Sequence, residues 1–209
     1  MSQKKAILLD MYGVILQESK GYFIPYTYEH FDESEYERIT YLFRKEKLFT
    51  KAGNGEISSD EFLTLLGYQD PQYRMRDYIE NYLTLDPSFV PFAERFYQER
   101  DFILLSNDVS EWSAHITSFY RLDKYFRHKI VSGDVKCRKP DKHIFEIALS
   151  EMKKQPGDCL FIDNSVENLR AAEELGIIPI LFNRDGVEYD GITVSSFEEL
   201  AEIIAKEHL

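Results

Sequence analysis

The sequence predicts an α/β protein with a doubly wound, Rossmann-like parallel sheet and an inserted helical cap, and three observations support this. Short apolar runs of strand length recur along the chain, each bounded by turn or polar residues. The stretches between the later runs place apolar residues at helical spacing, and such alternation is typical of a parallel sheet covered by helices. Roughly 90 residues separate the first run from the second, far more than an ordinary crossover needs, so a further unit is expected there.

The expected strands are, in chain order, Ala6–Leu9, Phe102–Leu105, Lys129–Val131, Leu160–Ile162 and Ile178–Leu181. Each has the length and the boundaries typical of a strand. Two helical faces are expected between the later strands, formed by Ile144, Ile147, Ala148 and Met152 and by Leu169, Ala172 and Leu175. Gly176 follows the second face and is expected to cap that helix at its C-terminus.

The interval between the first two strands is rich in aromatic residues. Residues 22–49 contain nine of them, which are expected to form the core of the inserted unit. One or two of Tyr22, Phe23 and Tyr26 are expected to face a bound ligand instead. Helices are expected around Glu35–Leu48, Ser59–Leu66 and Gln72–Leu83.

The stretch GNGEISSDEF, residues 53–62, is typical of a loop that enters a helix. Ser58 or Ser59 is the expected N-cap, with Asp60 or Glu61 near the positive end of the helix. The predicted domains are an α/β core from residues 1–16 and 86–209 and a helical cap from residues 17–85.

Composition excludes several classes of function. A formal net charge of -12 opposes binding to a nucleic acid, which needs clustered Lys and Arg, although a local basic pocket can still hold a small phosphate. The first ten residues hold too few apolar side chains for a signal peptide or a membrane span. Cys137 and Cys159 form no close-spaced metal pattern. We therefore expect a soluble, cytoplasmic protein without disulfides or membrane contact; the sequence leaves its oligomeric state open.

Polar residues follow the expected strands where each one ends. Asp10 follows the first strand, Ser106 and Asn107 follow the second, and the pair Asp163–Asn164 follows the fourth. In open α/β sheets, ligands bind beyond the carboxyl ends of the strands. Together with Lys139, which lies between the third and fourth strands, these residues place a nucleophile, a hydroxyl group, a cation and metal ligands at one edge.

The same segments resemble the four motifs of the haloacid dehalogenase superfamily of hydrolases. The motifs appear in order as DMYGVIL, LLSND, RKP and FIDNSVENLRAAEELG, and with the insertion they account for nearly the whole chain. The chain is most similar to the small phosphatases related to bacterial glucose-1-phosphatase and to the amino-terminal domain of soluble epoxide hydrolase. This resemblance implies hydrolysis of a small phosphorylated metabolite, with sugar phosphates among the candidates.

The resemblance also implies a nucleophile and a metal. Asp10 would attack phosphorus and form an aspartyl-phosphate. Mg²⁺ would be held by Asp10, by the backbone carbonyl of Tyr12, by Asp163 or Asn164 of the fourth motif, and by water, in the oxygen geometry that this ion requires.

Further residues are implied to hold the phosphoryl group. Lys139 would neutralise charge on the nucleophile and on the phosphoryl oxygens. The Ser106 hydroxyl and the backbone N–H groups near Met11, Tyr12 and Asn107 would bind the oxygens on which transition-state charge develops. The helical cap would close over the site and select the leaving group.

Two residues depart from the superfamily pattern. Tyr12 stands where an aspartate commonly protonates the leaving oxygen, and a phenol with a pKa near 10 is a poor substitute for that catalytic acid. Asn164 stands where a second acid commonly binds the metal, so weaker metal binding is expected.

Tyr12 opens an alternative, because DxYG is the first-motif form of the 2-haloacid dehalogenases, which need neither magnesium nor a protonated leaving group. Asp163, Ser165 and Asn168 argue against it, since dehalogenases resemble SxNxxD at these positions. A third possibility is a catalytically degenerate member that binds a phosphorylated ligand. The sequence therefore favours a phosphatase over these two alternatives.

Overall fold

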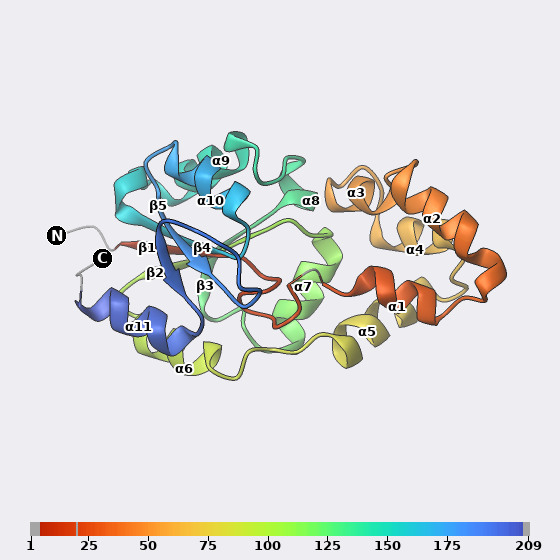
Figure 1. Cartoon of the computed structure of the whole chain (residues 1–209), viewed down its shortest axis with the longest axis horizontal. Helices are drawn as coiled ribbons and strands as arrows, with labels where there is room; N and C mark the ends of the chain where they lie inside the picture. Colours follow the sequence, from red (N-terminus) through yellow and green to blue (C-terminus); the bar gives the residue numbers. More distant parts are fainter. Residues whose placement is uncertain (1–4, 20, 207–209) are drawn as a thin grey trace.

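The computed structural model describes residues 5–19 and 21–206. The chain forms an α/β part around one parallel sheet, and a helical part beside it that lies between the first two strands in sequence (Figure 1). The sheet has six strands in the order β3-β2-β1-β4-β5-β6, and every neighbouring pair is parallel. The strands are β1 (Ala6–Leu9), β2 (Asp101–Ser106), β3 (Phe126–Val131), β4 (Cys159–Asp163), β5 (Ile178–Phe182) and β6 (Ile192–Val194). The chain thus winds outward from β1 in one direction and then in the other, which confirms the predicted doubly wound fold.

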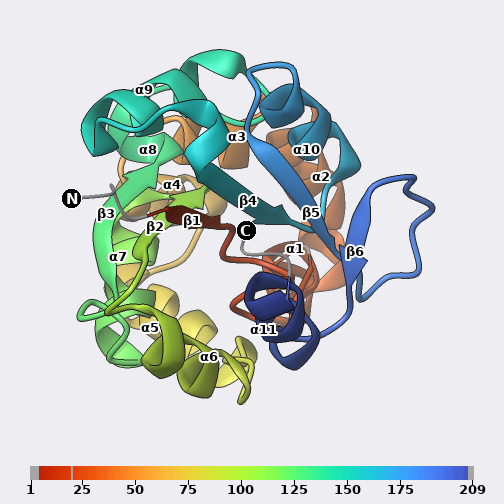
Figure 2. The same cartoon turned by 90° about the vertical axis from the view of Figure 1, so that its left-hand side faces the viewer.

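Helices cover both faces of this sheet because its central strands are apolar on both sides. Ala6 and Leu8 of β1 belong to the core cluster that includes α9 and α10, whereas Ile7 and Leu9 belong to the cluster that includes α6, α7 and α11. Figure 2 shows α9 and α10 over one face, and α6 and α11 over the other. The helices are α6 (Phe89–Phe96), α7 (Ser110–Phe119), α8 (Ser132–Val135), α9 (Lys142–Met152), α10 (Val166–Glu173) and α11 (Phe197–Lys206).

All five strands expected from the sequence are present, and four of them extend by one to three residues beyond the predicted bounds. Strand β6 was not expected, because its three residues ITV are too short to give a pattern and pair only with β5 at the edge of the sheet. Gly176 adopts the left-handed conformation expected of a C-terminal cap, with φ +87°, although α10 already ends at Glu173.

The helical part contains five α-helices in its described residues, and two of the three expected helices are nearly as predicted. Ser58 caps the helix that begins at Ser59, since its side chain accepts the Glu61 N–H at 3.2 Å. Asp70 caps the next helix, which therefore begins one residue before the predicted start. The five are α1 (Phe23–Glu29), α2 (Tyr36–Arg44), α3 (Leu48–Gly53), α4 (Ser59–Leu66) and α5 (Pro71–Tyr82).

The expected helix Glu35–Leu48 is wrong as a single element. Helix α2 ends at Arg44, Lys47 adopts a left-handed conformation with φ 55°, and α3 begins at Leu48. This break turns the chain so that Leu48 and Ala52 are buried in the core. Helix α1 was not expected, because its sequence FIPYTYE contains a proline and few strong helix formers.

Aromatic packing joins the helical part to the α/β part. The Phe23 ring lies 4.8 Å from the ring of Trp112 on α7, measured between centroids, and the Trp112 Nε1–H donates to Ser59 Oγ at 2.7 Å. Phe23 and Tyr26 are buried, as expected of cap core, whereas Tyr22 is exposed. The two parts therefore share one continuous apolar core.

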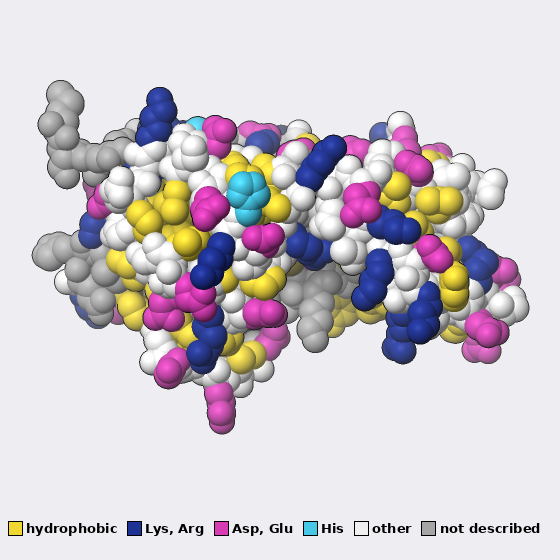
Figure 3. Space-filling view, turned by 90° about the horizontal axis from the view of Figure 1, so that it is seen from above, with side chains coloured by type: hydrophobic (Ala, Val, Ile, Leu, Met, Phe, Trp, Pro, Cys, Tyr) yellow, Lys and Arg dark blue, Asp and Glu magenta, His cyan; other side chains and the backbone are white. Residues whose placement is uncertain are grey.

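Neither cysteine forms a disulfide: Cys159 is buried and Cys137 is half-buried. No helix within residues 5–19 and 21–206 has the length and apolar character needed to cross a membrane. On the face shown in Figure 3, Lys and Arg side chains gather over the helical part, with Asp and Glu side chains among them.

Candidate active site

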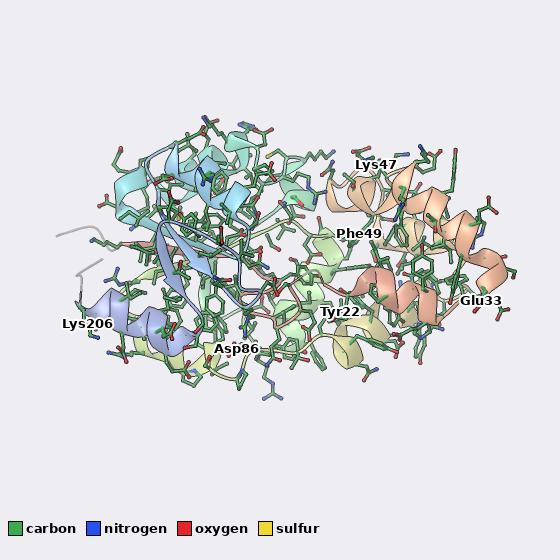
Figure 4. All side chains as sticks on the ribbon, viewed as in Figure 1. Tyr22, Glu33, Lys47, Phe49, Asp86 and Lys206 are labelled. Atoms are coloured by element: carbon green, nitrogen blue, oxygen red, sulfur yellow. The ribbon has the colours of Figure 1, made fainter. Side chains whose placement is uncertain are left out.

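Most of the predicted site residues come together at the carboxyl ends of β1, β2 and β4. Asp10, Tyr12, Asn107, Lys139 and Asn164 line one cavity there, and Asp163 contacts Lys139, whereas Met11 and Ser106 are fully buried and do not line that cavity. Asp10 directly follows β1, and its backbone N–H donates to the carbonyl of Ile162 in β4 at 3.0 Å. Because β1 pairs with both β2 and β4, the residues that follow these three strands meet at one edge of the sheet. This edge faces the helical part, with Tyr22 and Phe49 at the junction (Figure 4).

Lys139 is the centre of the site. Its Nζ lies 2.7 Å from Oδ1 of Asp10 and 2.7 Å from Oδ2 of Asp163, and it also donates to the carbonyl of Leu105 at 2.8 Å. All three side chains are buried. Burial alone would lower the pKa of the Lys139 amine, but the two carboxylates raise it above its ordinary value. The lysine is therefore a buried cation shared by two carboxylates.

Asn107 holds the Lys139 backbone in place. Its Nδ2 donates to the Lys139 carbonyl and its Oδ1 accepts the Lys139 N–H, both at 2.8 Å. These two bonds occupy the Asn107 side chain. Ser106 is fully buried, and its hydroxyl has no hydrogen-bond partner within the described residues.

Asp163 and Asn164 have different surroundings. The Asp163 carboxylate also accepts the Ser165 N–H at 2.7 Å and the Asn168 amide at 3.1 Å. These bonds orient the carboxylate, which in turn holds the Lys139 amine. The Asn164 Nδ2 donates to the Ser19 carbonyl at 3.4 Å, which leaves the oxygen of that amide as the atom suited to a cation. Metal binding by either residue stays a prediction.

Tyr12 contacts Asp108, a buried acid in the loop that follows β2. Its hydroxyl donates to Oδ1 of Asp108 at 3.1 Å, and Asp108 also accepts the Val109 N–H and the Ser113 hydroxyl. Burial raises the pKa of Asp108 to about 7. Burial, followed by the charge of Asp108, raises the Tyr12 pKa well above its ordinary value, so the phenol keeps its proton.

Asp10 is also affected by its burial. Desolvation raises the pKa of its carboxyl to about 6, and the charge of Lys139 prevents a larger rise. A carboxylate that is poorly solvated yet held by a single cation is suited to act as a nucleophile near neutral pH.

Two neighbouring cavities lie at this edge of the sheet. The inner cavity, of about 260 Å³, is lined by Asp10, Tyr12, Ser19, Gly21, Phe49, Tyr78, Asn107, Asp108, Arg138, Lys139, Asn164 and Asn168. The outer cavity, of about 1160 Å³, is lined by Gln17, Glu18, Ser19, Tyr22, Ile24, Pro25, Phe49, Tyr82, Asn164, Ser165, Val166, Asp185 and Val187. Ser19, Phe49 and Asn164 line both, so the two cavities adjoin each other.

Asp108, Arg138 and Tyr78 are among the residues of the inner cavity that the sequence analysis did not identify. Asp108 is the last letter of LLSND and Arg138 the first of RKP, so both lay inside predicted motifs, but neither was singled out. The Arg138 guanidinium makes no hydrogen bond or ion pair within the described part of the chain, and burial lowers its pKa. Tyr78 comes from α5, and no sequence motif indicated it.

The oxygen donors of the inner cavity fit magnesium. No group of three or more His, Cys, Asp or Glu side chains in the described residues is arranged to hold a metal. The available side-chain donors are the Asp10 carboxylate and the Asn164 amide, and the resemblance to the superfamily adds the backbone carbonyl of Tyr12. Magnesium takes oxygen ligands and keeps several waters, so it needs few protein donors, whereas transition metals favour imidazole and thiolate.

Comparisons with known proteins agree with this fold. A family model described as haloacid dehalogenase-like hydrolase matches residues 4–176. The fold is similar to the HAD family enzyme BT-2542 from Bacteroides thetaiotaomicron, with a TM-score of 0.74 and 19% identity over 90% of this chain and 97% of that one. A structure of that enzyme was solved in complex with magnesium and inorganic phosphate.

Other solved structures include both chemical classes. A HAD phosphatase from Thermococcus onnurineus has a TM-score of 0.71 and 18% identity over 96% of this chain and 97% of its own. A dehalogenase has a TM-score of 0.69 and 20% identity over 98% of this chain and 99% of its own. Among curated proteins, the drimenol cyclase drtB of Aspergillus calidoustus is 30% identical over 84 residues, which are 40% of this chain and 14% of that protein.

Proposed function

The chain belongs to the haloacid dehalogenase-like hydrolases, and from its site we propose that it is a magnesium-dependent phosphatase of small phosphate monoesters, acting through an aspartyl-phosphate on Asp10. The observation that carries the proposal is the polar inner cavity. It brings the Asp10 carboxylate and the Asn164 amide together with the cations Arg138 and Lys139. A phosphoryl group needs this combination of a nucleophile, a metal ligand and positive charge.

The chemistry divides into two displacements. An oxygen of Asp10 attacks phosphorus, and the bond between phosphorus and the ester oxygen breaks, releasing the alcohol. Water then attacks the phosphorus of the aspartyl-phosphate, which releases inorganic phosphate and restores the carboxylate. Lys139 lies 2.7 Å from Oδ1 of Asp10 and keeps that side chain in a fixed position.

Asp10, Asn164 and the Tyr12 carbonyl are the groups that would hold magnesium. When bound, this ion supplies positive charge next to the phosphoryl oxygens. Arg138 is proposed to bind the same oxygens, because its guanidinium faces the inner cavity without a partner among the described residues.

Tyr12 is a weak acid in this site, because its pKa is raised and its hydroxyl already donates to Asp108. The leaving oxygen therefore departs largely as an anion, and substrates with good leaving groups are favoured. Asp163 supports a phosphatase over a dehalogenase, because its carboxylate fixes the lysine at 2.7 Å where the dehalogenase motif has serine.

A screen of phosphorylated metabolites tests the proposal. It is run with and without magnesium, with 2-chloropropionate included, on the wild type and on Asp10→Asn. Phosphate release that needs both magnesium and Asp10 supports the proposal. Chloride release would favour the dehalogenase instead, and no release at all would favour a degenerate ligand-binding member. The proposed ligand is a small phosphorylated metabolite; a cytoplasmic location and the absence of nucleic-acid and membrane partners remain predictions.

A further inference from the structure

The outer cavity is where the leaving group of a bound ester must lie. It adjoins the inner cavity at Ser19, Phe49 and Asn164, and its volume of about 1160 Å³ is more than four times that of the inner cavity. A phosphoryl group at Asp10 fills the small polar space, so the alcohol part of the ester extends into the larger one.

Apolar side chains gather in this outer cavity. Eight large apolar side chains are exposed within the described residues, and four of them line it, namely Tyr22 (58% exposed), Ile24 (43%), Tyr82 (37%) and Val187 (42%). They come from three separate segments of the chain, and both the helical part and the α/β part contribute. Exposed apolar residues that converge on one concave surface indicate a binding site rather than ordinary surface variation.

The described lining of the outer cavity disfavours a second anion. The ionisable side chains among its described lining are Glu18 and Asp185, apart from tyrosine, and neither Lys nor Arg is among them. A leaving group that carries another phosphate or a carboxylate would therefore meet negative charge. An uncharged apolar alcohol meets no such penalty.

The backbone conformation at Tyr22 holds its side chain in an exposed position. Its φ of 54° is left-handed, which is unusual for a bulky residue, and it directly precedes α1. The next residue, Phe23, is buried in the aromatic core. Such backbone conformations concentrate at ligand-binding sites, where the surrounding packing maintains them. Figure 4 shows Tyr22 beside the junction of the two parts, near Phe49.

We infer that the outer cavity binds an uncharged apolar alcohol group of the phosphate monoester whose phosphoryl group binds at Asp10, and that this group is aryl, because a phenol is also a good leaving group. The inference rests on the proposed function and narrows its substrate class away from sugar phosphates. Ile24 and Tyr22 are then specificity-determining residues rather than catalytic ones.

Calorimetric binding of n-alkylphosphonates with two, four, six and eight carbons tests this inference in the presence of magnesium. Phosphonates are not hydrolysed at the P–C bond, so leaving-group pKa plays no part. Kd should fall about fourfold for each added methylene of the alkyl chain that is fully buried, and about twofold for each one that is half buried. A phosphonate of eight carbons that ends in a carboxylate should bind more weakly than the one that ends in a methyl group.

A pair of variants assigns the effect to the cavity. Ile24→Asn should reduce the dependence of Kd on chain length. Leu65→Asn is the matched control and should leave it unchanged, because Leu65 is 49% exposed on α4 and does not line the outer cavity. A Kd that does not depend on chain length, or no binding at any length, would overturn the inference. Phosphate release from phenyl phosphate, measured on the same preparation, decides the proposed function separately.

Discussion

Replacing Lys139 with methionine should destabilise the protein and abolish its activity, because two buried carboxylates would lose their shared cation. The Lys139 Nζ lies 2.7 Å from an oxygen of Asp10 and 2.7 Å from an oxygen of Asp163, and the lysine side chain is 1% exposed. Removing one partner of a buried ion pair typically costs about 3–5 kcal/mol of unfolding free energy. Since a domain is stable by roughly 5–15 kcal/mol, the loss is a large fraction of the total.

The loss should also depend on pH. Burial already raises the pKa of Asp10 from 3.8 to about 6 against the opposing charge of Lys139, and without the lysine it rises further. A carboxyl with a folded-state pKa above its unfolded value binds a proton that the unfolded chain lacks. The contribution of such a carboxyl to the free energy of unfolding is therefore present at low pH and is lost as the pH rises through the folded-state pKa. The deficit of Lys139→Met relative to wild type should be smaller at pH 5 than at pH 8.

Urea unfolding at these two pH values measures the effect, and Lys129→Met is the matched control. The Lys129 Nζ lies 2.6 Å from an oxygen of Asp123, but the two side chains are 38% and 52% exposed. Breaking an exposed ion pair of this kind should change the free energy of unfolding by about 0–1 kcal/mol. Equal losses in the two variants, or a Lys139→Met deficit that is the same at both pH values, would refute the reasoning.

Three further predictions concern the metal, the leaving group and the turn after β1. Asn164→Asp should lower the magnesium concentration needed for half-maximal activity, because it adds a charged oxygen ligand; unchanged affinity by calorimetry would mean that Asn164 is not a ligand. Tyr12→Asp should accelerate esters with poor leaving groups most, by up to roughly 10²–10⁴-fold, although the new charge beside Asp10 opposes the gain. Rates on esters graded by leaving-group pKa check this, and a wild-type rate independent of that pKa would contradict it. Gly13→Ala should raise the required magnesium concentration, because φ is +78° and the added Cβ would lie 2.2 Å from Asn164 Nδ2. Gly157→Ala is the control, with no atom within 4 Å of its Cβ, and an equal effect there would contradict the prediction.

The strands were predictable because each of the five is a local apolar run. In β1 and β4 every residue is buried, so hydrophobicity alone marks them. Strand β6 escaped prediction because an edge strand of three residues needs little apolar sequence. The break between α2 and α3 escaped because Lys47 adopts its left-handed conformation to let Leu48 enter the core, and no residue type in that segment signals such a turn.

The rule that ligands bind beyond the carboxyl ends of parallel strands indicated the edge of the sheet where the candidate site lies. It could not predict which side chains in the site contact one another. Asp10 and Asp163 were expected at one edge, yet their common attachment to Lys139 depends on where the loop after α8 returns to the sheet. The bond between Tyr12 and Asp108 joins residues 96 positions apart. It requires the parallel pairing of β1 with β2, in which Leu9 lies beside Leu104. Such contacts follow from sheet register, which the sequence does not state.

Tyr12 replaces the second acid of the first motif, and its hydrogen bond to Asp108 explains its position in the site. The first motif lacks its second carboxylate, but the end of β2 brings a buried carboxylate to the tip of the tyrosine, 3.1 Å from its hydroxyl. Asp108 is held by Ser113 and by the Val109 N–H, so the tyrosine is the group that is oriented. Because the phenol keeps its proton and points to Asp108, the space that an aspartate would fill with charge is occupied by a neutral ring. The inner cavity therefore has its carboxylate on Asp108, beyond the Tyr12 hydroxyl, rather than on the first motif.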